Sequence, residues 1–104
     1  MNNKVLIKLI VPEINQEFDL FIPVNEIIWK IKKLLIASIK ELCSCTLNDT
    51  EYILINMNNN RKYNNNEIVI NTDIRNASEL MLIPSKKEYK ALHFWYEPYL
   101  GDIN

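Results

Sequence analysis

Few residues in this chain have the types and spacing that chemistry requires. The two cysteines, Cys43 and Cys45, are separated by one residue. They are too few for a disulfide framework and lack the second ligand pair of a zinc site. Nothing nearby in the sequence would lower a thiol pKa, so we interpret both as small hydrophobic side chains, with a thiol-dependent activity as the enzymatic alternative. The pattern predicts free thiols in a reduced, cytoplasmic environment.

The other candidate for chemistry is the single histidine, His93. It could form a base and nucleophile pair only with one of the cysteines, and no glycine-rich turn is near to bind an oxyanion. The carboxylates are dispersed, without the spacing of calcium or magnesium ligands. We therefore predict no enzymatic activity, no cofactor and no metal site.

Composition limits the possible partners. The 104 residues include 12 Lys and Arg against 13 Asp and Glu, a formal net charge of -1. This length fits one globular domain, and the charge balance gives no field for holding a phosphate backbone. No apolar run approaches the length of a membrane span. We predict a soluble domain with no nucleic-acid partner and no membrane insertion.

Alternating apolar residues and turn signals predict five strands. The first two form a hairpin, because a proline ends each of them with a short polar stretch between. Three further apolar segments in the second half of the chain are predicted strands, and the second of them is short. The predicted strands cover residues 4–11, 17–22, 51–57, 61–63 and 79–83.

One long helix is predicted over residues 25–42, which contain neither glycine nor proline. Asn25 is the expected N-cap, and Glu26 is favourable in the first turn of the helix. At 100° per residue, one broad stripe faces the sheet. Its members are Ile27, Ile28, Ile31, Leu34, Leu35, Ser38, Ile39 and Leu42.

The order of these elements indicates an α+β fold, the β-grasp, with a mixed sheet and one crossover helix. A right-handed crossover would place the strand at 79–83 beside the strand at 4–11, parallel to it and at the centre of the sheet. We predict a domain over residues 1–84 and an aromatic C-terminal extension over residues 85–104.

Three segments carry a resemblance to known families. Residues 74–83 resemble the end of ubiquitin-like domains, where a turn leads into a last apolar strand. More specifically, Phe18-Asp19-Leu20-Phe21-Ile22-Pro23 and the helix after it resemble the YukD/EsaB family of bacterial type VII secretion systems. The helix residues concerned are Ile28, Ile31, Leu34, Leu35, Ser38 and Ile39. The resemblance implies a cytoplasmic, non-enzymatic accessory or regulatory protein whose partner is a secretion-system component.

Ubiquitin-like modifiers and sulfur carriers need a terminal pair of glycines, because a side chain there would clash in the activating enzyme. The only glycine in this chain is Gly101, which is followed by three other residues. We therefore do not expect conjugation or sulfur transfer.

A second side of the predicted helix carries Trp29, Lys33, Ile36 and Lys40. Two large apolar groups with a basic rim are typical of a protein-binding surface. Two other interpretations remain open: the C-terminal extension covers this side, or the residues are scattered apolar groups on the surface.

The extension is too aromatic to stay solvated. Phe94, Trp95 and Tyr96 are its expected anchors, whether they dock on their own domain, on a second copy or on another protein. The alternative function is accordingly a structural module that homodimerises through this extension.

Overall fold

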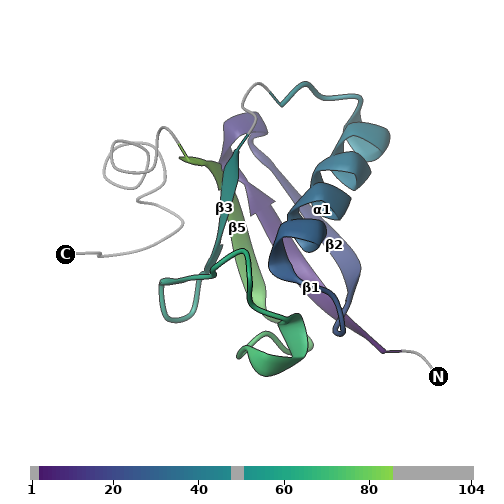
Figure 1. Cartoon of the computed structure of the whole chain (residues 1–104). Helices are drawn as coiled ribbons and strands as arrows, with labels where there is room; N and C mark the ends of the chain where they lie inside the picture. Colours follow the sequence, from purple (N-terminus) through teal and green to yellow (C-terminus); the bar gives the residue numbers. More distant parts are fainter. Residues whose placement is uncertain (1–2, 48–50, 86–104) are drawn as a thin grey trace.

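A computed structural model of the chain describes residues 3–47 and 51–85 (Figure 1). In these residues a five-stranded sheet packs against one α-helix, α1 (Ile28–Cys43). Two short 3-10 helices, η1 (Pro12–Ile14) and η2 (Val69–Asn71), lie in connections. The strands are β1 (Lys4–Val11), β2 (Gln16–Pro23), β3 (Tyr52–Asn56), β4 (Arg61–Lys62) and β5 (Glu79–Pro84).

The sheet has the order β2-β1-β5-β3-β4. β1 and β2 form the antiparallel hairpin, and β3 is antiparallel to both β5 and β4. β1 and β5 are parallel, with Leu9 opposite Leu80. The predicted α+β β-grasp topology, including a last strand beside the first at the centre of the sheet, is confirmed.

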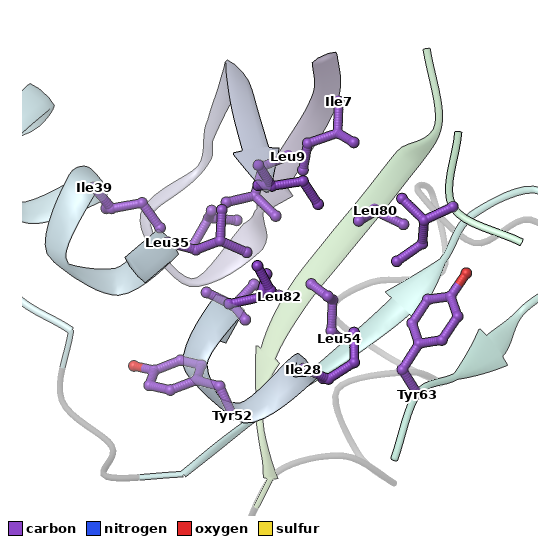
Figure 2. Packing of buried hydrophobic residues seen from close by; sticks show 14 of the residues in the cluster. Ile7, Leu9, Ile28, Leu35, Ile39, Tyr52, Leu54, Tyr63, Leu80 and Leu82 are labelled. Atoms are coloured by element: carbon purple, nitrogen blue, oxygen red, sulfur yellow. The ribbon is translucent and has the colours of Figure 1, made fainter. Parts of the chain in front are cut away.

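The core lies between α1 and one face of the sheet. Alternate strand residues point toward the helix because successive side chains of a strand point to opposite faces. Figure 2 shows Leu35 and Ile39 of α1 near Leu9 and Leu82 of the sheet. The helix residues buried in this core are Ile28, Ile31, Leu35 and Ile39.

The buried stripe of α1 is narrower than predicted. Leu34 is 44% exposed and Leu42 is 61% exposed, so their assignment to the core was wrong. Leu34 lies about 60° around the helix beyond Ile31, at the edge of the buried stripe. Leu42 lies in the last turn of the helix.

The start of α1 also differs from the prediction. The helix begins at Ile28 with Ile27 as N-cap, so Asn25 is not the cap. Backbone carbonyls of a distant loop accept the first amide protons instead: Ile28 N–H donates to Glu67 O at 2.8 Å, and Trp29 N–H donates to Asn65 O at 3.3 Å. These bonds satisfy amides that a helix cannot pair internally.

A polar cluster holds the loop that supplies these carbonyls. Arg61 forms ion pairs with Glu67 and with Asp73, the second at 3.5 Å. Tyr63 donates its hydroxyl proton to Asp73 and accepts a hydrogen bond of 2.9 Å from Asn56. The loop is therefore fixed to β3 and β4 on one side and to the start of α1 on the other.

Asp73 makes the stability of this cluster dependent on pH. Burial acts to raise its pKa, but hydrogen bonds from Tyr63 and Asn59 and the charge of Arg61 outweigh burial and lower the pKa below its ordinary value. A carboxyl whose pKa is lower in the folded state adds stability above its unfolded pKa, about 4, and loses it as the pH falls through the folded value. We expect Asp73→Asn to unfold with a shallower acid dependence than the wild type below about pH 4, measured by urea unfolding across pH. Equal acid slopes for both proteins would contradict this prediction.

The cysteines are not free. Cys43 and Cys45 are joined by a disulfide across the end of α1, so the prediction of two free thiols was wrong. Ser44 between them has a left-handed conformation, with φ of 54°, which ends the helix. The pairing leaves no thiol for the alternative thiol-dependent activity. It also removes the support that free thiols gave to a reducing environment.

Candidate functional site

A groove with a volume of about 300 Å³ lies between α1 and the start of β3. Four residues on successive turns of the helix form one wall, and the beginning of β3 forms the other. Two further parts of the chain close the groove: the capping loop, which contains Asn65 and Glu67, and Ser85 after the end of β5. The lining residues are Trp29, Lys32, Lys33, Ile36, Glu51, Tyr52, Ile53, Asn65 and Ser85.

Trp29 is the largest side chain of this groove. It is 39% exposed, and its backbone N–H is held by Asn65 of the capping loop. The ammonium nitrogen of Lys33 lies 4.9 Å from the centre of the indole ring, and that of Lys30 lies 5.9 Å away. Both are within the range of cation–π attraction, so the ring is presented with a positive rim.

Lys32 links the two walls. Its ammonium group donates a hydrogen bond of 2.7 Å to the backbone carbonyl of Tyr52 at the start of β3. The pKa of Lys32 is lowered, mainly by burial. The charge of Glu51 opposes this shift, and the charge of Lys62 adds to it. The hydroxyl of Tyr52 in turn donates to Glu13 of η1 at 2.6 Å, so a second hydrogen bond holds the wall formed by β3. The groove is therefore built on ordered elements.

The structure brings together three of the four helix residues that the sequence singled out. Trp29, Lys33 and Ile36 line the groove, whereas Lys40 is exposed farther along α1 and is not among the lining residues. Ile36 is half-buried and packs against the core, so it is less exposed than a position on the second side of the helix predicts. It lies only about 80° from Ile28 around the helix, at the border of the buried stripe.

The residues predicted in the C-terminal extension, Phe94, Trp95 and Tyr96, lie outside the described residues, and so does His93. The second wall of the groove was missed because it depends on tertiary contacts. Nothing in the sequence near Tyr52 or Asn65 indicates that they face Trp29. Their side of the groove exists only because β3 pairs with β5 and the capping loop returns to α1.

Residues 3–47 and 51–85 contain no group of three or more His, Cys, Asp or Glu side chains placed to hold a metal ion. The helix over this range is also too short and too polar to cross a membrane. What the groove offers a ligand is aromatic and aliphatic surface beside lysines, which suits a protein segment with apolar and acidic side chains.

No family model and no curated protein sequence matches the chain. Solved structures do. A structure described as molecular mimicry of SUMO that promotes DNA repair is 14% identical, with a TM-score of 0.58 over 80% of this chain and 94% of that one. The N-terminal ubiquitin-like domain of the 4931431F19Rik protein is also 14% identical, with a TM-score of 0.57 over 80% of this chain and 76% of that one.

A third similar structure is a chain of the MycP5-free ESX-5 inner membrane complex. It is 12% identical, with a TM-score of 0.58 over 78% of this chain and 21% of that chain. At these identities the likeness concerns the fold. Together with the strand order and the single crossover helix of the described residues, these neighbours show that the chain has the ubiquitin-like β-grasp fold.

Proposed function

We propose that this protein is a non-enzymatic adaptor that binds another protein through the groove between α1 and β3. The observation that carries the proposal is the half-exposed indole of Trp29 beside Ile36 and under the ammonium group of Lys33. Tryptophan surrounded by other side chains at the centre of a contact is the residue type that most often dominates binding energy. Lys33 and Lys40 form the basic rim, which favours an acidic partner.

The proposed partner is a component of a bacterial type VII secretion system, and the proposed location is the cytoplasm. Two findings of different kinds support this assignment. The sequence resembles the YukD/EsaB family at Phe18–Pro23 and along α1, and one structure of the same fold comes from an ESX-5 inner membrane complex. The proposed role is accessory or regulatory.

The experiment is a direct binding measurement between the purified full-length chain and the purified cytoplasmic domains of the type VII secretion ATPase of the same organism. We expect measurable affinity for the wild type and a loss of tenfold or more for Trp29→Ser, since replacing a central tryptophan commonly costs about 2 kcal/mol. Lys33→Glu should weaken binding and reduce its dependence on salt.

Phe21→Ser is the matched control, because Phe21 is 62% exposed on β2 and does not line the groove. It removes a large exposed aromatic side chain and should bind as the wild type does. The proposal fails if the wild type binds no secretion component. It also fails if Trp29→Ser binds normally while Phe21→Ser does not.

A further inference from the structure

A second apolar cluster lies on the face of the sheet that points away from α1. Its residues are 0 to 9% exposed, as deeply buried as those of the main core. They come from three neighbouring strands at the centre of the sheet. The cluster consists of Ile10, Ile53, Ile55, Met81 and Ile83.

The helix cannot be what buries this cluster. Leu80 and Leu82 of β5 belong to the core under α1, so Met81 and Ile83 between them point to the opposite face. Ile55 lies opposite Met81 in the register of β3 and β5. Figure 1 shows α1 on one face of the sheet only. Among the described residues, Met57 is the partly buried hydrophobic residue packed against the cluster.

The burial is confined to one half of that face. On β1 and β2, Lys8 and Glu17 are exposed and form an ion pair of 3.9 Å. Leu6 and Phe21, which lie opposite each other in the hairpin, are 39% and 62% exposed. A bound layer that covered the whole face would bury these residues as well. The covering group is therefore small and sits over β3, β5 and the end of β1.

One segment outside the described residues starts close to the cluster. The described residues omit 1–2, 48–50 and 86–104, and only the last segment is long enough to cover side chains from three strands. It starts at residue 86, directly after Ser85, which follows the end of β5 and whose N–H donates to Glu51 O at 3.0 Å. Ser85 is thus two residues from Ile83 of the cluster.

The composition of that segment fits an apolar surface. Residues 86–90 are mainly charged, whereas an aromatic stretch begins at Leu92. Seven extended residues reach about 20 Å, and neighbouring strands are about 5 Å apart, so the aromatic stretch can return across β5 and β3. We propose that residues 86–104 form a third layer on the sheet, with Phe94, Trp95 and Tyr96 packed on the cluster of Ile10, Ile53, Ile55, Met81 and Ile83.

In this arrangement the C-terminal extension does not cover the helix side that carries Trp29, an interpretation that the sequence left open. The extension covers the open face of the sheet, and the wall of the groove that α1 forms with Trp29, Lys33 and Ile36 stays accessible to a partner. The chain itself thereby closes an apolar face that would otherwise favour association with other proteins. The inference differs from the proposed function in its occupant, since the chain itself covers the cluster and another protein binds the groove; Ile53 is the residue that the two surfaces share.

The test is nuclear Overhauser spectroscopy on the full-length protein with labelled methyl groups. We expect contacts from the ring protons of Trp95 and its aromatic neighbours to the methyl groups of Met81, Ile53 and Ile55. Contacts to Ile36 instead, or no contacts from these rings to any methyl group, would overturn the proposal. A sample that mixes labelled and unlabelled chains separates contacts within one chain from contacts between chains. Contacts between chains would also overturn it, since a second copy would then be the occupant.

A triple variant tests the third layer independently. Replacing Phe94, Trp95 and Tyr96 by serine should expose the methyl group of Met81 to a soluble paramagnetic agent, which broadens the signals of accessible groups. Trp29→Ser is the control, because it removes a tryptophan from the groove and should leave Met81 protected. Protection of Met81 in the triple variant equal to that in the wild type would contradict the third layer.

Discussion

Replacing Leu35 by alanine should lower the free energy of unfolding by about 2–5 kcal/mol, the range measured for large-to-small changes in cores. Leu35 is 1% exposed and lies in the middle of α1, between the helix and the central strands (Figure 2). The removed methyl groups lose their burial, and the surrounding side chains cannot fully close the resulting cavity. Urea unfolding followed by circular dichroism measures the difference.

Its neighbour provides a closely matched control. Leu34→Ala makes the same chemical change one residue earlier on the same helix, but Leu34 is 44% exposed. Its effect should stay within about 0.5–1 kcal/mol, because alanine also favours the helix slightly more than leucine. Equal losses at both positions would mean that α1 faces the sheet with a different side from the one described here.

Tyr63→Phe should destabilise the protein by about 1–3 kcal/mol, although it removes a single oxygen atom. Tyr63 and Asn56 are both 3% exposed. Without the hydroxyl, the amide of Asn56 loses its hydrogen-bond acceptor in a place that water cannot easily reach, and Asp73 loses a donor. Because the phenyl ring keeps its packing, the loss measured by urea unfolding reports the polar cluster.

The same substitution at Tyr52 separates this effect from a general response to losing a hydroxyl. The hydroxyl of Tyr52 donates to Glu13, which is half-buried and within reach of water. We expect Tyr52→Phe to cost less than Tyr63→Phe, about 1 kcal/mol or below. The reverse order would show that the cluster around Asp73 contributes little to stability.

Much of the fold could be predicted because local and global signals agree in it. β1 was predicted with the bounds it has, and the other strands agree to within one or two residues at each end. The run Leu80-Met81-Leu82-Ile83 predicted a deeply buried strand because it lacks any polar alternation. The structure gives the reason: Leu80 and Leu82 point to the core under α1, and Met81 and Ile83 belong to the second cluster.

The features that were missed depend on contacts between distant parts of the chain. Asn25 is a good N-cap by residue type, but the carbonyl groups of Asn65 and Glu67 take that role from another loop. Helical periodicity placed Trp29, Lys33 and Ile36 on one side correctly. It could not show that Tyr52 completes a groove beside them, because the wall formed by β3 requires the tertiary pairing of β3 with β5.

The parallel pairing of β1 with β5 also affects how the chain acquires its structure during synthesis. Lys8 lies opposite Glu79 in this pairing, so the centre of the sheet joins segments from nearly opposite ends of the domain. Contacts of such long sequence separation form slowly, since the loop between them must close first. A nascent chain on the ribosome can form the hairpin and the first turns of the helix early. The central pairing forms only after the last strand has left the exit tunnel, and until then the apolar side chains of β1 lack the partner strand that covers them.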